Sequence, residues 1–474
     1  MKLRILRQAG LGIVLVAGVP LWSQVNPAPD TTAVPPATEN AAAPATDATA
    51  APATDTDENR MQTPPPVSGA AYPTNYTAEE RSNYLRGGLT FTTAYNDNVL
   101  GGLASNRVSD VSYAIFPNIA FDETTSRLHW VLSYSPGFTF YQRLSSRNQE
   151  NQNLSSTFKY RLSPHVTLSL GDTFQKSSSV LDQPDLALAG AVTGGAQSVV
   201  TGLIPPLADE LTNSANAELT YQFSANGMIG ASGTFTNLNF TNPAQVPGLF
   251  DSSSQGGSAF YSHRLSKKHY LGASYQYQRI AAFPIGAQSE TQTQTLTQTH
   301  AVLVFYTFYP QPNLSLSVSA GPQYSDVSEP PLPSAHAWSP AATASFGWQA
   351  RHTNLAASYS RTITGGGGLL GAFNSNTANL SLRQQLSKNW SAQVVGGYSI
   401  LKTVSPVLFS SSPGGHTISA SASVQRKLGQ HMSAEAGYMR LHQSYSDIAA
   451  ISTAPDTNRE WVSISYQFAR PLGR

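Results

Sequence analysis

Cysteine is absent from this sequence of 474 residues, so disulfides, thiolate metal sites and cysteine nucleophiles are all excluded. Charge is scarce as well: only 12% of the residues are Asp, Glu, Lys or Arg, about half the share that is usual in soluble globular proteins. The net charge of +1 gives no reason to expect a nucleic acid as a partner. Mean hydropathy is nevertheless −0.22, because Ser, Thr, Asn, Gln and Gly stand where charged residues are missing.

Long apolar runs are missing too, which limits how the chain could meet a membrane. After residue 24 no segment approaches the roughly 20 apolar residues that a membrane-spanning helix needs. Residues 1–24 have the pattern of a secretory signal peptide, in which Lys2, Arg4 and Arg7 precede a short apolar run. We expect cleavage near Ser23–Gln24 and export of the mature chain.

Residues 25–80 are rich in Ala, Pro and Thr and include the triple proline Pro64–Pro66. Such a composition buries too little apolar surface to offset the entropy that ordering costs. We therefore predict a disordered, extended linker in the periplasm. A plain spacer is the simplest interpretation, and a tether to periplasmic components is the alternative.

From residue 84 onward the sequence alternates between apolar and polar residues in segments of about ten, which matches β-strands tilted across a membrane. In one such segment Leu128, Trp130 and Tyr134 share a face, and His129 and Ser133 share the other. The polar face consists mostly of Ser, Thr, Gly and Gln, whereas a soluble β-sandwich would expose Lys and Glu. Small neutral residues suit the inside of a closed barrel.

Short turns and long connections also alternate along this region. Several short turns share a signature in which Leu is followed by a small residue, as in Leu162-Ser163 and Leu386-Ser387. About eight short turns and nine long connections predict an antiparallel transmembrane β-barrel of about 18 strands over residues 84–468, with 16 as the alternative. An even number of strands puts both chain ends on the short-turn side, which we assign to the periplasm. A short tail, 469–474, follows the barrel.

The last segment of the barrel, WVSISYQF, has four apolar residues on one face: Val462, Ile464, Tyr466 and Phe468. It resembles the C-terminal recognition strand of outer-membrane barrels, which ends in an aromatic residue. The resemblance implies a strand that the barrel-assembly machinery recognises, although Ala469–Arg474 follow the aromatic residue here.

A second resemblance rests on Leu89–Gly101, which reads LTFTTAYNDNVLG. An aromatic strand leads into a Tyr-x-Asp-Asn-Val turn formed by Tyr95, Asp97, Asn98 and Val99. In these residues the chain resembles the outer-membrane β-barrel porin type 2 group. The resemblance implies a barrel in the bacterial cell outer membrane with an undefined cargo. Some members are associated with exopolysaccharide operons, so an accessory role in exopolysaccharide secretion is an alternative to a porin.

Motifs for catalysis are few. Gly366, Gly368 and Gly371 match G-x-G-x-x-G, but they fall in a Gly-rich loop without the βαβ unit that a dinucleotide site requires. There is no G-x-S-x-G elbow, P-loop or H-E-x-x-H pair. We predict no enzymatic activity, no cofactor and no metal site.

Four histidines lie at or beside the expected short turns: His165, His269, His352 and His431. They form either part of the interfacial belt or a metal-binding or pH-sensitive rim. We favour the belt, because polar aromatic residues are typical of membrane interfaces.

Charged residues at inward positions crowd the short-turn mouth. They are Arg86, Lys159, Arg161, Glu218, Arg264, Arg383 and Glu435. Their simplest role is to anchor turns or to pair with one another. The functional alternative is a mainly cationic ring that biases passage toward anions. No spiral of inward aromatic residues, of the kind that guides sugars, is predicted.

The longest connection, about 176–212, is unusually apolar and carries Asp182, Asp185, Asp209 and Glu210. Long connections of this kind are usually functional or disordered. We expect it to fold into the lumen and narrow the pore, with an exposed cap or partner surface as an equal alternative.

The sequence therefore predicts a porin-like channel for passive diffusion of small hydrophilic solutes through the lipid bilayer of the outer membrane. A structural or adhesive barrel without transport is a further alternative. The oligomeric state stays undefined at this level.

Overall fold

The computed structural model describes residues 61–68, 83–100, 107–178, 209–242, 250–284, 294–328, 333–365, 372–404, 414–446 and 456–471. All of them belong to one compact unit, Asp55–Arg474. Besides strands, these residues form a short helix, α1 (Pro65–Ser68), and a 3-10 turn, η3 (Ser145–Arg147). Within this described part, no helix has the length and apolar character needed to cross a membrane.

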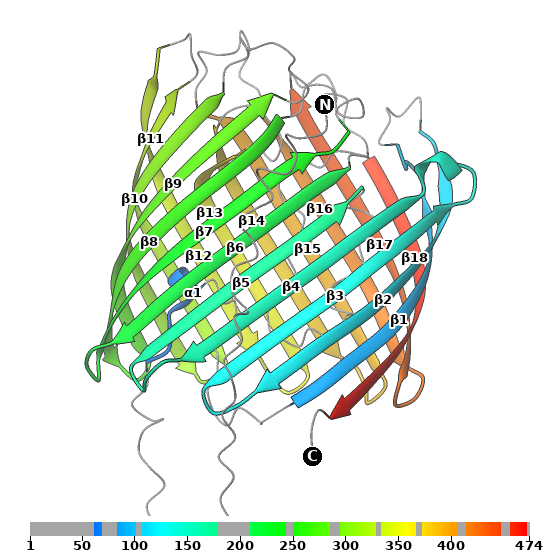
Figure 1. Cartoon of the computed structure of the whole chain (residues 1–474), viewed down its shortest axis with the longest axis horizontal. Helices are drawn as coiled ribbons and strands as arrows, with labels where there is room; N and C mark the ends of the chain where they lie inside the picture. The colour runs from blue at the N-terminus through cyan, green and yellow to red at the C-terminus, as the bar shows by residue number, and fades with distance from the viewer. Residues whose placement is uncertain are drawn as a thin grey trace, which may run out of the picture. The chain divides into compact units, whose positions relative to one another are not determined.

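Eighteen strands form one antiparallel sheet that closes on itself (Figure 1). Each strand pairs with its sequence neighbours, and β1 pairs with both β2 and β18. This confirms the predicted barrel of about 18 strands rather than 16. The strands are β1 (Asn83–Asn96), β2 (Asp110–Thr124), β3 (Leu128–Tyr141), β4 (Gln149–Arg161), β5 (Val166–Ser177), β6 (Glu210–Gln222), β7 (Gly227–Phe240), β8 (Phe250–Ser266), β9 (His269–Pro284), β10 (Thr295–Gln311), β11 (Leu314–Ser328), β12 (Ala335–Gln349), β13 (Thr353–Gly365), β14 (Ala372–Gln385), β15 (Trp390–Thr403), β16 (Gly414–Lys427), β17 (Met432–Ser446) and β18 (Asp456–Pro471).

The connections alternate in length. Short turns follow the even-numbered strands from β2 to β16, and longer connections follow the odd-numbered ones. We call the two ends of the barrel the short-turn end and the long-loop end. The barrel extends beyond the predicted range, because Ala469–Pro471 continue β18 and pair with Tyr84–Arg86 of β1. Part of the expected tail is therefore barrel wall, since β1 offers backbone partners there.

The Leu-Ser signature has a local structural reason. The hydroxyl of Ser163 accepts hydrogen bonds from the backbone N–H groups of His165 and Val166, at 3.2 and 3.1 Å. Ser387 does the same for Trp390 at 3.2 Å. A serine that accepts nearby backbone N–H groups stabilises a tight turn, so these short turns were visible in the sequence.

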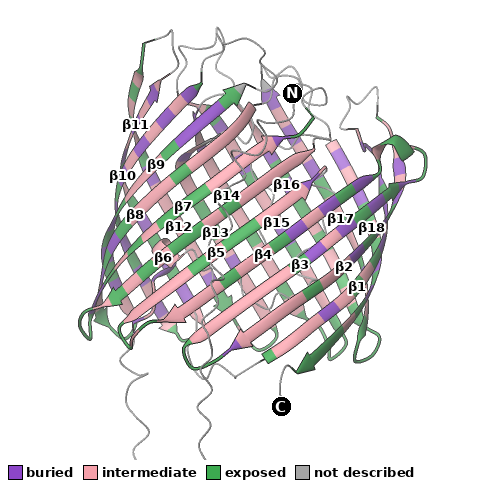
Figure 2. Ribbon diagram, in the orientation of Figure 1, coloured by how far each residue is buried: buried purple, intermediate pink, exposed green. Residues whose placement is uncertain are grey.

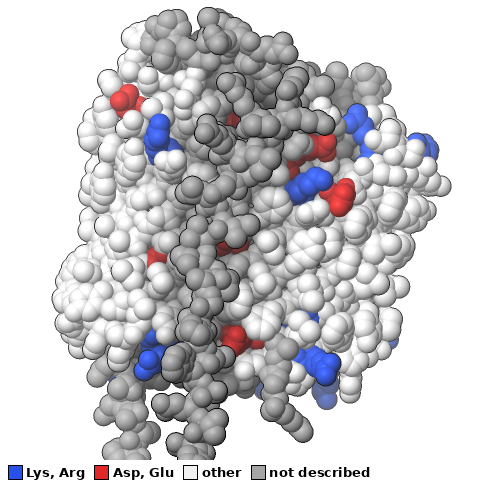
Figure 3. Space-filling model, in the orientation of Figure 1, with Lys and Arg blue, Asp and Glu red and all other residues white. Residues whose placement is uncertain are grey.

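Large apolar side chains project from the outer face of the barrel. In β10, Val302 and Val304 are 53% and 58% exposed, whereas the inward Leu303 and Phe305 are 3% and 1% exposed. Exposure alternates in this way along many strands (Figure 2), because the concave face crowds side chains and the convex face spreads them. Charged groups are few on the face in Figure 3, and most of the described surface seen there is uncharged. Such an apolar outer face is the surface that a membrane barrel presents to lipid.

The four apolar residues of the last strand follow this pattern. Val462, Ile464, Tyr466 and Phe468 are all exposed on the outer face of β18. The face on which they lie was therefore predicted correctly, and their role in assembly stays a prediction.

Tyrosine–histidine pairs lie on the outer face of β9–β12. Their ring nitrogens and hydroxyls are 2.5 to 3.0 Å apart in His269–Tyr306, Tyr275–His300 and Tyr324–His336. Rings with a polar tip are typical of the membrane–water boundary. For His269 the tyrosine contact favours the interfacial belt. Among the described residues, no group of three or more His, Asp or Glu is arranged to hold a metal ion.

The Tyr-x-Asp-Asn-Val motif closes the seam between β1 and β18. Asn458 donates from its backbone N–H and its side-chain amide to the two carboxylate oxygens of Asp97, both at 2.7 Å. Arg107 lies 3.5 Å from Asp97 and 3.8 Å from Asp456. The motif therefore ties the end of the first strand to the start of the last one.

Candidate functional site in the lumen

Pairs of small hydroxyl side chains line much of the lumen. Inward Ser and Thr residues face each other across neighbouring strands and hydrogen-bond at 2.7 to 2.9 Å, as in Thr90–Ser465, Ser133–Ser155, Ser232–Ser258, Thr307–Ser317 and Ser319–Thr343. Each hydroxyl both donates and accepts. The wall is therefore polar without charge, and it suits water and neutral hydrophilic solutes.

The seven predicted charged residues take inward positions near the short-turn end of their strands. They are Arg86 on β1, Lys159 and Arg161 on β4, Glu218 on β6, Arg264 on β8, Arg383 on β14 and Glu435 on β17. They do not form a uniform ring, because their partners differ from one part of the wall to another.

On β1–β6 positive and negative groups compensate each other. Arg86 forms an ion pair with Asp122 at 3.2 Å, and His129 lies 3.9 Å from the same carboxylate. Lys159 stands opposite His129 in the β3–β4 register and attracts the Glu218 carboxylate electrostatically. Arg86 and Lys159, balanced by Asp122 and Glu218, therefore contribute little net charge to the mouth, and Arg161 on β4 adds one positive charge.

Two further predicted residues are engaged in the wall itself. The Arg264 guanidinium donates to the side-chain oxygen of Asn226 in the β6–β7 turn at 3.1 Å and hydrogen-bonds with Tyr270. Glu435 is buried, and its register neighbours are Gln425 and Ser463. The contacts of Arg264 anchor a turn, which is the simpler of the two predicted roles.

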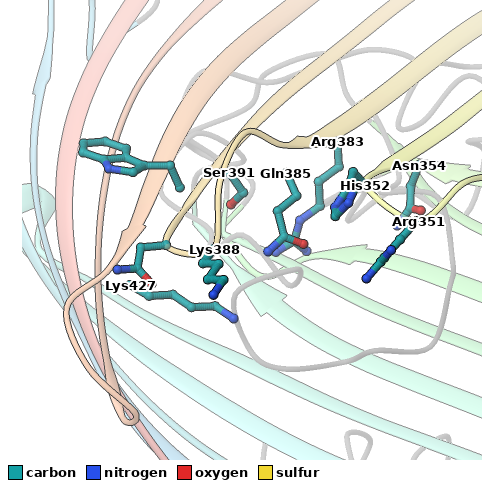
Figure 4. A pocket seen from close by; sticks show the side chains of 10 residues that line it. Arg351, His352, Asn354, Arg383, Gln385, Lys388, Ser391 and Lys427 are labelled. Atoms are coloured by element: carbon teal, nitrogen blue, oxygen red, sulfur yellow. The ribbon is translucent and has the colours of Figure 1, made fainter.

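A positively charged pocket lies at the short-turn end of β12–β16. It is a cavity of about 210 Å³, and no acidic residue is found among the described residues that line it. Figure 4 shows Lys388 and Lys427 on one side and Arg351, His352 and Arg383 on the other. The full lining is Arg351, His352, Asn354, Arg383, Gln385, Lys388, Asn389, Trp390, Ser391 and Lys427. An anion that approaches this mouth meets several cations held on one concave surface.

Two residues of this pocket were singled out in the sequence: Arg383 as an inward charge and His352 as a histidine beside a short turn, for which the interfacial belt was favoured. Arg351, His352 and Lys388 lie in two short turns, and Lys427 ends the neighbouring β16. The signal that was available is the repetition of basic residues at the short turns of consecutive hairpins. Such turns lie side by side in an up-and-down barrel.

An apolar cluster, here called the lumenal cradle, interrupts the polar lining on β7–β10. Its inward residues are Met228, Phe260, Tyr270, Phe305 and Tyr309. A Cβ added to Gly230 would clash with the Phe260 ring, and one added to Gly272 would clash with the Phe305 ring. The two glycines therefore let these rings lie flat against the wall.

Met61, from the segment that precedes the barrel, packs into the lumenal cradle and is only 4% exposed. Its backbone N–H donates to the side-chain oxygen of Gln222 at 3.1 Å, and the Tyr270 hydroxyl hydrogen-bonds with the backbone of Gln62. Val67 packs on the same cluster. Burying a methionine side chain contributes about 1.5–3 kcal/mol.

The placement of residues 61–68 differs from the expectation for the linker. They fall in the range 25–80 that was expected to lack structure, yet they form α1 and dock in the lumen, where Figure 1 shows α1 within the barrel. The physical reason is that the barrel supplies the apolar partners that the linker sequence lacks.

The long connection after β5 is described only at its ends. Asp182 and Asp185 lie outside the described residues. Glu210 begins β6 and accepts a hydrogen bond from Thr212 at 2.7 Å, and the Asp209 carbonyl accepts the Thr241 N–H at 2.8 Å. These contacts brace the start of β6, and the constriction of the pore by this connection stays a prediction.

Comparison with solved structures finds similar folds at very low sequence identity. OccAB4 from Acinetobacter baumannii is 10% identical, with a TM-score of 0.40 and coverage of 83% of this chain and 100% of that one. FpvA from P. aeruginosa is 9% identical, with a TM-score of 0.42 and coverage of 81% of this chain and 72% of that one. The ferric citrate transporter FecA is 12% identical, with a TM-score of 0.39 and coverage of 78% of this chain, and this chain spans only 60% of its length. No family model and no curated protein matches the sequence.

Proposed function

We propose that the chain is a bacterial outer-membrane channel through which small hydrophilic solutes diffuse passively. One observation carries the proposal: a single closed sheet of 18 strands has an apolar outer face and a hydroxyl-lined inner face. Barrels of about 16–18 strands leave room for an aqueous channel. The lining offers neutral hydrogen bonds, so passage requires no chemical step.

We further propose that the short-turn end and both chain ends face the periplasm. Bacterial outer-membrane barrels have short periplasmic turns and longer extracellular loops, and the alternation of connections fits this rule. In this orientation β18 is the strand offered to the barrel-assembly machinery, and the basic pocket faces the periplasm.

The basic pocket supports a weak preference for anions. Rings and patches of Arg and Lys bias a pore toward anions because they attract them and repel cations. On β1–β6 the charges compensate each other, whereas the pocket on β12–β16 adds positive charge with no acidic lining residue. The expected preference is modest, since the cations occupy one sector of the mouth.

Recordings in planar lipid bilayers test the function directly. The purified full chain should give a steady, ohmic conductance, and a KCl gradient should give a zero-current potential of the sign that anion preference requires. Heat-denatured protein provides the control. Folded barrels without conductance would contradict the channel and would favour the accessory barrel for exopolysaccharide secretion or the structural or adhesive barrel.

A further inference from the structure

We propose that the lumenal cradle is a binding site for the chain's own segment 61–68, and that the docked segment narrows the channel. The site and its occupant are both described: Met61 packs among Met228, Phe260, Tyr270, Phe305 and Tyr309. The occupant lies N-terminal to the barrel wall, so it can leave the site without breaking any strand pairing.

The chemistry of the cradle fits a thioether side chain. The surrounding lining consists of hydroxyl pairs, and an apolar ring cluster left open there would contact water. Methionine is unbranched and flexible, and its sulfur makes favourable contacts with aromatic rings. Met61 therefore covers apolar surface of the lumenal cradle.

Backbone contacts fix the path of the segment as well. Gln222 accepts the N–H of Met61 at 3.1 Å, and Tyr270 hydrogen-bonds with the backbone of Gln62. These two contacts come from different walls of the cradle, β6 and β9. The segment is held by non-covalent contacts alone, and its covalent link to the barrel keeps its effective concentration at the site high. Docking is therefore reversible and does not require a partner protein.

The path of residues 61–68 along the inner wall determines how much of the lumen they occupy. Met61 contacts β7–β10, and α1 lies beside β11 and β12. The segment thus follows the wall across neighbouring strands, which narrows the lumen. A helical turn is about 10 Å wide, so its release should raise the single-channel conductance. This consequence rests on the channel function proposed above, whereas the docking itself does not.

Cysteine cross-linking tests the docking. The chain has no cysteine, so a double variant with Met61→Cys and Met228→Cys has only one possible intramolecular disulfide. In isolated membranes we expect oxidation to shift its electrophoretic mobility and a reductant to reverse the shift. The matched control pairs Met61→Cys with Gln425→Cys, an inward residue of β16, and should not cross-link. Equal cross-linking of both pairs, or of neither, in folded barrels would overturn the docking.

Single-channel conductance tests the narrowing. Met61→Asp places a charge in the apolar cradle and should raise the conductance above that of the unmodified chain, while the strands are unchanged. Thr63→Asp adds the same charge to a residue outside the cluster and should conduct like the unmodified chain. Equal conductance of all three proteins would overturn the narrowing. If none of them conducts while the Met61–Met228 pair still cross-links, the docking stands and the channel function fails.

Discussion

Two sectors of the barrel wall at the short-turn end have the same backbone pattern and opposite chemistry. On β7–β10 the inward positions carry the rings of the lumenal cradle, and Met61 covers them. On β12–β16 the corresponding end carries Arg383, Lys388 and Lys427 around an open pocket. One sector holds a piece of the chain itself, and the other presents positive charge to solutes that reach this end of the barrel.

This difference shows that an alternating strand fixes which side chains face the lumen but leaves their chemistry free. The hydroxyl pairs between Thr307 and Ser317 or Ser232 and Ser258 set a neutral background. Where a few inward positions on neighbouring strands carry other residue types, they form an apolar binding site or a positively charged pocket. In the proposed channel, solutes pass between the docked segment and the basic sector.

The largest expected effect comes from opening the lumenal cradle. Phe305 is buried against Gly272 and the rest of the cluster, so Phe305→Ala should reduce the free energy of unfolding by about 3–5 kcal/mol. Urea titration of the barrel in lipid vesicles measures this loss. The comparison variant, Arg383→Ala on the basic sector, should lose less than about 1 kcal/mol. Similar losses at the two positions would mean that the sectors do not differ in packing.

An intermediate effect is expected from reversing the charge of the pocket. The double variant Arg383→Glu and Lys427→Glu should bring the zero-current potential in a KCl gradient close to zero, because the two new carboxylates balance the remaining Arg351 and Lys388 of the pocket. The change should shrink at high salt, as the Debye length falls from about 10 Å at 0.1 M to about 3 Å at 1 M. Reversing Lys267 and Lys268 in the β8–β9 turn should have a smaller effect. If both double variants shift the zero-current potential equally, ion selectivity depends on the overall charge of the barrel and not on the pocket.

The smallest effect is expected where charges already compensate. Asp122→Asn removes the partner of Arg86 and should cost at most about 1 kcal/mol of folding free energy, as for other partly exposed ion pairs. It should also move the zero-current potential slightly toward anion preference. The same bilayer and urea measurements report both quantities. A shift toward cation preference would contradict the compensated state of this sector.

The strands and their faces were predictable because the signals are local. Alternation within one segment placed Arg86, Lys159 and Glu218 on the inner face, and the Leu-Ser turns marked where strands end. Side chains of a strand alternate between its two faces, so once one apolar residue is assigned to the lipid face, the face of every other residue in that strand follows. The predicted number of strands was correct for the same reason.

The docked segment and the basic pocket were not predictable in this way. Met61 meets side chains from four strands, and no feature of the linker itself indicates that partner surface. The pocket joins turns that lie about 40 residues apart in sequence, Arg351, Lys388 and Lys427. The extension of β18 to Pro471 depends on β1, at the other end of the barrel sequence. Each of these features arises from neighbours that only the closed sheet brings together.

The seam between β1 and β18 has a consequence for how the barrel is made. Thr90 and Ser465 hydrogen-bond across a separation of 375 residues, and Asp97 and Asn458 join across 361. Contacts so distant in sequence form slowly, because a long loop must close first. Until Asp456–Pro471 has been synthesised, both edge strands expose unpaired backbone groups that invite aggregation. A chain that lacks this last strand therefore cannot close the sheet, and β1 and β17 are left with unpaired edges.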